Sequence, residues 1–154
     1  MKYRRAPFKD VKRQVIPLAR KSFQEVDSRV KNAFDINVNE DLYEAMEAGG
    51  NYAMFVAEDD DGVIHGYLGV VISESPHIIG YMQAVQDSMY VEESFRQAML
   101  VKGLISAAED YANEIKCSSI TIGFKANRPH TKFANSMGYD SGDVMHTKIL
   151  EGVE

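Results

Sequence analysis

Apolar residues recur at two different spacings along this chain, and the spacing separates expected helices from expected strands. Between Val11 and Phe34 they fall three or four residues apart, as on one face of an amphipathic helix. Asp10 lies just before this pattern, where its carboxylate can cap the helix. Pro17 lies inside it and lacks the N–H group that a helix interior needs. The pattern therefore predicts either a kink near residues 13–17 or a helix that restarts with Pro17 in its first turn.

Two shorter elements flank this region. Residues 2–8 alternate in character and predict a short first strand. Residues 42–46 carry apolar side chains at helical spacing and predict a second helix, with Asn37 or Asn39 as its cap. Gly49-Gly50 is expected to end that helix, because glycine accepts the left-handed conformation found at helix ends.

Three consecutive extended runs follow, at residues 51–58, 63–73 and 77–91. The turns between them lie at residues 59–62 and 74–76, which are rich in Asp, Gly, Ser and Pro. Strands joined by tight turns pair antiparallel, so these runs predict a meander. The third run is long enough to need a bulge or another irregularity.

The longest helical pattern of the chain comes next, and it lies between two strands. The remaining expected elements are a helix at residues 98–115, a strand at 118–124, a short helix capped by Asn127 and ended by Gly138, and a last strand at 144–150. A helix between two strands of one sheet usually makes a right-handed parallel crossover. The whole order predicts a single α+β domain over residues 1–154 with a mixed sheet.

Composition narrows the expected environment and partners. The chain has 154 residues and a net charge of −6, which argues against nucleic acid as a main partner. It contains no apolar run of the roughly 18 residues that a membrane helix needs, and we expect neither a membrane segment nor a signal peptide. The single cysteine, Cys117, excludes an internal disulfide framework and fits a reducing cytoplasm.

No metal site is expected. The four histidines have no metal-ligand spacing, and no cysteine joins them. Asp59-Asp60-Asp61-Gly62 is acidic, but it lacks the longer loop and distal Glu of an EF-hand. We interpret it as a hairpin turn.

The junction between the third extended run and the long helix is the most informative stretch. At residues 91–103 a strand turns directly into a helix, whose first N–H groups have no partners inside the helix. Together with the positive end of the helix dipole they suit a phosphate or pyrophosphate. Every strand–turn–helix unit has such an end, so the position alone is weak evidence.

This junction resembles the cofactor-binding motif of the GNAT family of N-acetyltransferases, V-x-P-x-x-R/Q-x-x-G-x-G/A. Val91 falls on the first position of the motif and Arg96 on the basic one. Glu93 stands in place of the usual proline, Met99 in place of the first glycine and Val101 in place of the second small residue. The Met99 side chain could crowd the loop, or it could point into the core and leave the N–H groups free.

A second stretch resembles the same family. The sequence N-R-P-H-T-K-F-A-N-S-M-G-Y is similar to the family pattern N-x-x-A-x-x-x-Y-x-x-x-G-F, with Asn127, Gly138 and Tyr139 on matching positions. Ala134 occupies the position of the family tyrosine. The order of elements is similar over residues 1–150, and it implies a GNAT-like twisted sheet with helices on both faces.

The resemblance implies transfer of an acetyl group from acetyl-coenzyme A to an amine of a small molecule or a protein. It also implies that a backbone N–H near residues 89–91 stabilises the oxyanion. The cofactor-binding residues that it implies are Met89, Tyr90, Val91, Arg96, Gln97, Ala98, Met99, Leu100, Val101 and Asn127.

For the catalytic groups, Asp87 is the candidate base because it lies on the strand before the loop, and Glu58 is the weaker choice. The alternative for Asp87 is a solvated or hydrogen-bonded strand residue. Tyr139 is a candidate to replace the missing hydroxyl at Ala134 as proton donor, and its alternative is an aromatic packed in the core.

A protein that keeps this fold and only binds a partner is the rival hypothesis, because Met99, Val101 and Ala134 all depart from the motifs. The two hypotheses differ in whether residues 95–101 present free N–H groups to a pyrophosphate. The acceptor amine is not revealed by the sequence. A homodimer is left open, since such proteins commonly form one.

Overall fold

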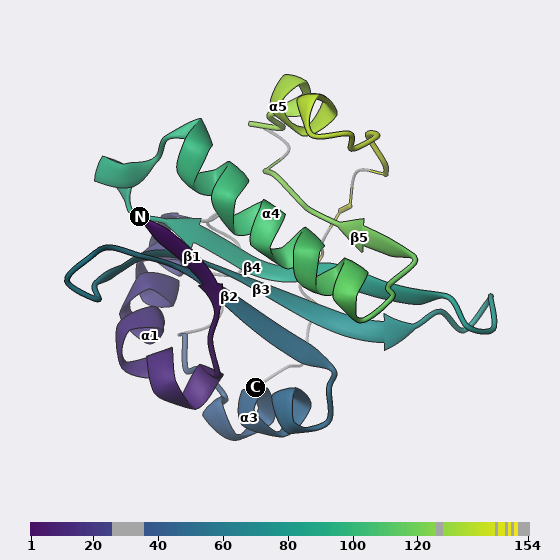
Figure 1. The fold of residues 1–154 in the computed structure, drawn as a ribbon, viewed down its shortest axis with the longest axis horizontal. Helices are drawn as coiled ribbons and strands as arrows, with labels where there is room; N and C mark the ends of the chain where they lie inside the picture. The colour runs from purple at the N-terminus through teal and green to yellow at the C-terminus, as the bar shows by residue number, and fades with distance from the viewer. Residues whose placement is uncertain (26–35, 126–127, 144, 147, 149, 151–154) are drawn as a thin grey trace.

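The computed structural model describes residues 1–25, 36–125, 128–143, 145, 146, 148 and 150. Five strands form a single sheet in the order β1-β2-β3-β4-β5 (Figure 1). The strands are β1 (Lys2–Arg5), β2 (Tyr52–Glu58), β3 (Ile64–Glu74), β4 (Met82–Val91) and β5 (Ser119–Thr121). The first four pair antiparallel and β4 pairs parallel with β5, which confirms the predicted mixed sheet.

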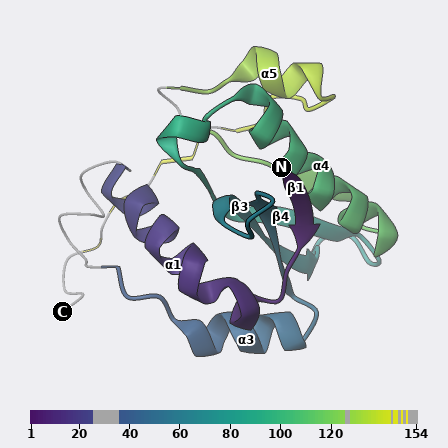
Figure 2. The same cartoon turned by 60° about the vertical axis from the view of Figure 1, so that its left-hand side comes forward.

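Helices cover both faces of this sheet. They are α1 (Phe8–Glu25), α3 (Glu40–Ala48), the short 3-10 helix η1 (Glu93–Phe95), α4 (Ala98–Glu114) and α5 (Thr131–Ser136). Figure 2 shows α4 on one side of the sheet and α1 on the other, with α3 beside α1. Among the described residues, no helix has both the length and the apolar character that crossing a bilayer requires.

Helix α1 begins at Phe8, so the predicted cap at Asp10 is wrong: Asp10 lies inside the first turn. A neighbouring helix supplies the acceptor instead. The Phe8 N–H donates to the two carboxylate oxygens of Glu47, at 3.0 and 3.2 Å, where a negative charge also suits the helix dipole. The helix runs through Pro17 without restarting. Its predicted continuation to Phe34 lies outside the described residues.

The second predicted helix is confirmed as α3. The Asn39 side chain caps it by accepting a hydrogen bond from the Leu42 N–H at 3.1 Å. After the helix, Gly50 adopts a φ of 76°, a conformation that glycine reaches without strain. Asn39, and not Asn37, is therefore the cap, and the glycine pair ends the helix as expected.

The turn between β2 and β3 is also confirmed. The Asp59 carboxylate accepts from the N–H groups of Asp61 and Val63 at 3.0 and 2.9 Å, and Gly62 has a φ of 80°. The acidic cluster thus closes a hairpin with its own backbone, as turn residues do.

Strand β4 contains the expected bulge. Gly69 of β3 pairs with Ser88, whereas Val70 pairs with Gln86, so Asp87 has no residue opposite it. A bulge bends its strand and increases the local twist. Beyond this point β4 has no paired neighbour in β5, which pairs only with Gln83–Val85. Strand β5 is therefore shorter than the predicted run at 118–124.

The predicted last strand at 144–150 is wrong for the residues described there. Met145, His146, Lys148 and Leu150 lie in no strand. The apolar side chains of Met145 and Leu150 are 91% and 68% exposed, so they have no sheet neighbour to pack against. An alternating pattern without a partner strand does not form a ladder.

The core lies in two layers. The layer under α4 is built from aliphatic side chains of β2, β3, β4 and α4. The layer under α1 and α3 includes the buried rings of Phe8, Tyr52, Tyr67 and Tyr90. At Gly69, a Cβ atom would lie 2.1 Å from the Tyr52 hydroxyl oxygen, so only glycine leaves room for this ring.

Candidate active site

The candidate site lies where β4 and β5 separate. The Gln86 side chain spans the start of the gap: its Nε2 donates to the Gly123 carbonyl at 3.2 Å, and its Oε1 accepts from the Gly123 N–H at 3.1 Å. A side-chain amide thus takes the place of the next ladder hydrogen bonds. Past it, the edge of β4 has no strand beside it within the described residues.

The backbone groups on this free edge can be assigned from strand geometry. The Glu92 N–H donates to the His65 carbonyl at 2.9 Å, so its backbone faces β3. Backbone groups along an antiparallel strand point alternately to either side, which turns those of Met89 and Val91 away from β3. Their N–H and C=O groups therefore face the gap, where the Val91 carbonyl accepts a hydrogen bond from Arg96 Nε.

The start of α4 lies at the end of the same strand. The first hydrogen bonds of α4 run from the Leu100 and Val101 N–H groups to the Gln97 carbonyl, at 3.0 and 3.3 Å. The N–H groups of Ala98 and Met99 are consequently at the free end of the helix. The Met99 side chain is 74% exposed, so of its two alternatives the one that points into the core is excluded. Leu100 takes the core position instead, at 5% exposure.

Arg96 links the loop before α4 to the end of α1. Its Nε donates to the Val91 carbonyl at 3.0 Å, and its terminal nitrogen forms an ion pair with Glu25. The guanidinium also lies 5.3 Å from the centre of the Tyr90 ring. Tyr90 completes the group, because its hydroxyl donates to Glu25 at 2.9 Å.

These contacts set the charge of Glu25. Partial burial would raise the pKa of Glu25, but the hydrogen bonds from Arg96 and Tyr90 outweigh burial and hold the pKa below its usual value. Glu25 is therefore a carboxylate at neutral pH. To contact a phosphate at the N-terminal end of α4, Arg96 must give up part of its ion pair with Glu25.

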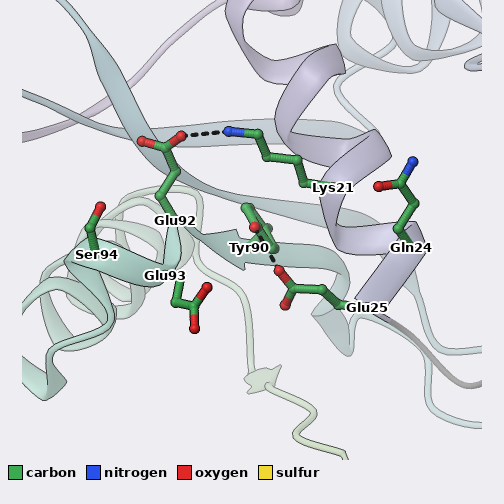
Figure 3. A pocket seen from close by; sticks show the side chains of 7 residues that line it. All are labelled: Lys21, Gln24, Glu25, Tyr90, Glu92, Glu93 and Ser94. Carbon is green, nitrogen blue, oxygen red and sulfur yellow. Dashed lines mark hydrogen bonds and ion pairs between the residues drawn. The ribbon is translucent and has the colours of Figure 1, made fainter.

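A pocket of about 620 Å³ opens beside this group (Figure 3). Its lining residues are Lys21, Gln24, Glu25, Tyr90, Glu92, Glu93 and Ser94. In Figure 3 the first three come from α1, and the others come from the end of β4 and the start of the loop. The ion pair between Lys21 and Glu92, at 2.8 Å, crosses the pocket between these two sides.

Asp87 lies on the bulge of β4, exposed to solvent. Its carboxylate accepts a hydrogen bond from the Tyr43 hydroxyl at 2.8 Å. The Tyr43 ring is itself held between Phe8 and Tyr52, with ring centres 5.1 and 4.9 Å away. Burial and then the nearby Asp87 raise the pKa of Tyr43, so its hydroxyl stays a donor. The bulge thus presents a fixed, solvent-accessible carboxylate.

The weaker candidate base, Glu58, lies elsewhere. Its carboxylate is bound by Arg4 Nε at 3.1 Å, across the β1–β2 pair at the far edge of the sheet. Asp87 is the candidate that the fold brings to the end of β4, on the same side of the sheet as Tyr90.

Tyr139 lies against α4. Its hydroxyl donates to Glu109 at 2.7 Å, and its ring packs against the core layer under α4. Burial and then Glu109 raise the pKa of Tyr139. Ala134 is tied to it through the backbone, since its carbonyl accepts from the Tyr139 N–H at 3.1 Å. Asn127 lies outside the described residues.

Sequence reasoning missed Tyr43 and Glu25. Tyr43 is 44 positions away from Asp87, and Glu25 is 71 positions away from Arg96. Both occupy ordinary positions in helical patterns, where no local motif marks them. Within the described residues, no group of three or more His, Cys, Asp or Glu side chains is placed to hold a metal ion.

A sequence profile described as the Acetyltransferase (GNAT) family matches residues 17–139. The chain belongs to this family. The match includes the free edge of β4, the start of α4 and the Ala134–Tyr139 contact. It therefore confirms the family that the two motifs indicated, although it leaves the acetyl donor and the acceptor unassigned.

Solved structures share the GNAT fold of this chain. A tetramutant of the BH1408 protein from Bacillus halodurans superposes with a TM-score of 0.76 at 16% identity, covering 97% of this chain and 100% of that one. Glucosamine-6-phosphate N-acetyltransferase from Arabidopsis thaliana has a TM-score of 0.71 at 15% identity, covering 97% and 98%. At such identities the likeness shows the fold alone.

A third structure is an aminoglycoside acetyltransferase, meta-AAC0020, from an uncultured soil metagenomic sample in complex with sisomicin. It has a TM-score of 0.74 at 19% identity, covering 97% of this chain and 96% of that one. No curated protein sequence matches the chain.

Proposed function

We propose that this protein is an N-acetyltransferase that moves an acetyl group from acetyl-coenzyme A to an amine of a small molecule or a protein. The observation that carries the proposal is the free edge of β4 beyond the bulge. It carries the backbone groups of Met89 and the N–H of Val91 close in sequence to the free end of α4, while the Val91 carbonyl accepts from Arg96. An extended amide-bearing chain can pair with such an edge, as an added strand does.

The donor would be held by both parts of this junction. The N–H groups of Ala98 and Met99 suit the pyrophosphate, because they lie at the positive end of the helix dipole. Gln97, Leu100 and Val101 shape that end through their backbone, and the exposed Met99 side chain lies at the same end. Tyr90 lies between the strand edge and the pocket, where its ring supports Arg96.

The chemistry requires an uncharged amine. Asp87 is proposed as the base that takes the ammonium proton, with Tyr43 fixing its carboxylate. The amine nitrogen then forms a bond to the acetyl carbon, and the Met89 N–H is the proposed donor to the oxyanion. The C–S bond breaks, the nitrogen loses its second proton to leave a neutral amide, and the thiolate that leaves takes up one proton.

The proton that the thiolate takes up needs a donor. Tyr139 remains a candidate, but its hydroxyl is already donated to Glu109. Replacement of Tyr139 by Phe separates the two roles. A drop in kcat of about 100-fold would assign proton transfer, whereas a loss of stability with little change in kcat would assign packing.

The acceptor is proposed to enter through the pocket between α1 and the end of β4. It lies on the same side of the sheet as Asp87, and carboxylates of Glu25, Glu92 and Glu93 line it. Two of the similar structures act on amino sugars by their names, an aminoglycoside and glucosamine-6-phosphate. Small amines of this kind are the first acceptors to screen.

The test begins with calorimetry of coenzyme A and acetyl-coenzyme A binding. We expect saturable binding that Arg96→Ala weakens roughly tenfold or more, as loss of a charge-assisted contact does. Arg13→Ala, an exposed arginine earlier on α1, is the matched control and should bind as the native protein does. Acetyl transfer to a panel of amines would follow.

Two outcomes would overturn parts of the proposal. Absence of binding at millimolar cofactor would remove the acetyl-coenzyme A site and favour a protein that keeps the fold for interaction. Binding without transfer to any amine would favour the same reading, which the missing hydroxyl at Ala134 already supports.

A further inference from the structure

The His65 ring is held between two carboxylates. Its Nδ1 lies 2.9 Å from Glu92 Oε2, and its Nε2 lies 2.8 Å from Asp59 Oδ2. A carboxylate can only accept hydrogen bonds, so both ring nitrogens must carry a proton. A histidine with two N–H donors is an imidazolium. The geometry therefore assigns a positive charge to His65.

The same ring also contacts the loop that leads into α4. It stacks on the Phe95 ring with centres 3.9 Å apart and planes inclined by 21°. Phe95 and Glu92 are in turn joined by a backbone hydrogen bond of 2.8 Å, from the Phe95 N–H to the Glu92 carbonyl. His65 thus contacts both ends of residues 92–95. The positive charge of its ring is attracted to the face of the Phe95 ring.

Every element packed around His65 contributes a charge. Asp59 comes from the β2–β3 turn, and Glu92 comes from the loop after β4. From α1, Lys21 pairs with the other oxygen of Glu92 at 2.8 Å. Further along the loop, Glu93 lines the pocket and Arg96 pairs with Glu25. Loss of the His65 proton would leave one ring nitrogen facing a carboxylate oxygen, lone pair to lone pair.

We propose that the His65 imidazolium is a positioning device for residues 92–97, and that its deprotonation loosens this loop and weakens cofactor binding. The inference rests on the proposed function in one respect, because it takes this loop as part of the cofactor site. His65 itself touches neither the cofactor nor the reacting atoms.

The direction of the pH effect follows from the surrounding groups. Partial burial would lower the pKa of His65, but the hydrogen bonds that its ring donates to Glu92 and Asp59, and the charges of these carboxylates, raise it above its usual value. We call the two hydrogen bonds of the His65 ring to Asp59 and Glu92, together with its stacking on Phe95, the clamp. The clamp contributes its full stability below the pKa of His65 in the unfolded chain, about 6.5. This stability is lost as pH rises through the raised pKa of the folded protein.

The acidic limit comes from the two carboxylates. The hydrogen bond from His65 lowers the pKa of Asp59, and those from Lys21 and then His65 lower the pKa of Glu92. The two carboxylates contribute stability above their pKa values in the unfolded chain, about 4. This stability is lost as pH falls through their lowered pKa values in the folded protein. The clamp therefore holds between mildly acidic and neutral pH.

The experiment measures coenzyme A affinity as a function of pH for three proteins. Native affinity should fall at least roughly fivefold from about pH 6 to about pH 9, a typical size for coupling between sites. His65→Gln should bind weakly at both values, because a neutral amide cannot donate to both carboxylates. His77→Gln, on the exposed β3–β4 turn, should keep the native profile. Ionisation of the cofactor itself is common to all three proteins.

A second measurement needs no cofactor and separates failure of this inference from failure of the proposed function. Backbone hydrogen exchange of residues 92–97, corrected for the intrinsic pH dependence of exchange, should lose protection at high pH in the native protein. His65→Gln should lack this protection throughout. If coenzyme A never binds but this pattern holds, the cofactor site is wrong and the clamp stands. Equal pH dependence in native and His65→Gln proteins would overturn the clamp.

Discussion

The sheet is covered by α4 on one face and by α1 and α3 on the other, and the two faces bury different kinds of side chain. Under α4 the core side chains are largely aliphatic, among them Leu68, Val70, Ile72, Leu104 and Ile105. Under α1 and α3 they include Tyr52, Tyr67 and Tyr90, with Tyr43 packed against them. On the first face the tyrosines are only partly buried, Tyr139 among them, whereas the second face encloses the buried rings of Tyr52, Tyr67 and Tyr90.

The hydroxyls explain why the candidate chemistry lies on the second face. A hydrogen-bond partner stabilises a buried hydroxyl, and two tyrosines of this face have a carboxylate in that role. Tyr43 holds Asp87 on the β4 bulge, and Tyr90 holds Glu25 in the lining of the pocket. The face under α4 stabilises the sheet, and the tyrosine-bearing face fixes the charged side chains.

The largest expected effect is on turnover, at Asp87. Asp87→Asn keeps the shape of the side chain but removes its basicity, so kcat/KM should fall by about 100-fold or more. The free energy of unfolding should change by less than about 0.5 kcal/mol, because the side chain is exposed. Asp110→Asn, on the solvent side of α4, is the matched control and should leave both quantities unchanged. Normal turnover in Asp87→Asn would remove it as the base.

The next effect is on stability, on the aliphatic face. Leu104 is 0% exposed, so Leu104→Ala should lower the free energy of unfolding by about 2–5 kcal/mol through lost burial and a cavity. Denaturant unfolding measures this loss. Leu42→Ala, at a side chain 52% exposed, should cost less than about 1 kcal/mol. Equal losses for both would contradict the assignment of the core to this face.

A smaller loss is expected at the join between β3 and the tyrosine layer. Gly69→Ala places a methyl group 2.1 Å from the buried Tyr52 hydroxyl, and overpacking of this kind costs about 1–3 kcal/mol. Gly142→Ala, with open space around it, is the control. Adding Tyr52→Phe should recover part of the loss, and strict additivity of the two changes would show that the contact is absent.

The smallest effect has the opposite sign. The Tyr52 hydroxyl is buried and has no hydrogen-bond partner among the described residues. Tyr52→Phe removes this unsatisfied group and should raise the free energy of unfolding by about 1 kcal/mol. Thermal or denaturant unfolding measures it. A clear loss of stability would mean that the hydroxyl does have a partner.

Local patterns predicted most of the elements but fewer of their limits. The strand meander, α4, the Asn39 cap and the need for a bulge in β4 all follow from spacing and from residue type over a few positions. Strand β5 is shorter than its apolar pattern because the bulge at Asp87 turns β4 away from it. The residues described at 145–150 form no strand. An alternating pattern forms a strand only where another strand lies beside it to accept its hydrogen bonds.

By itself the sequence determined the family, the order of the elements from β1 to α5 and the position of the β4–α4 junction, because patterns of residues close together in the chain carry each of them. Only the tertiary structure decided that Glu47 receives the Phe8 N–H, that Tyr43 holds Asp87 and that His65 lies between two carboxylates. Such pairs join distant segments. Their geometry depends on how helices and strands pack, and packing is a property of the whole fold.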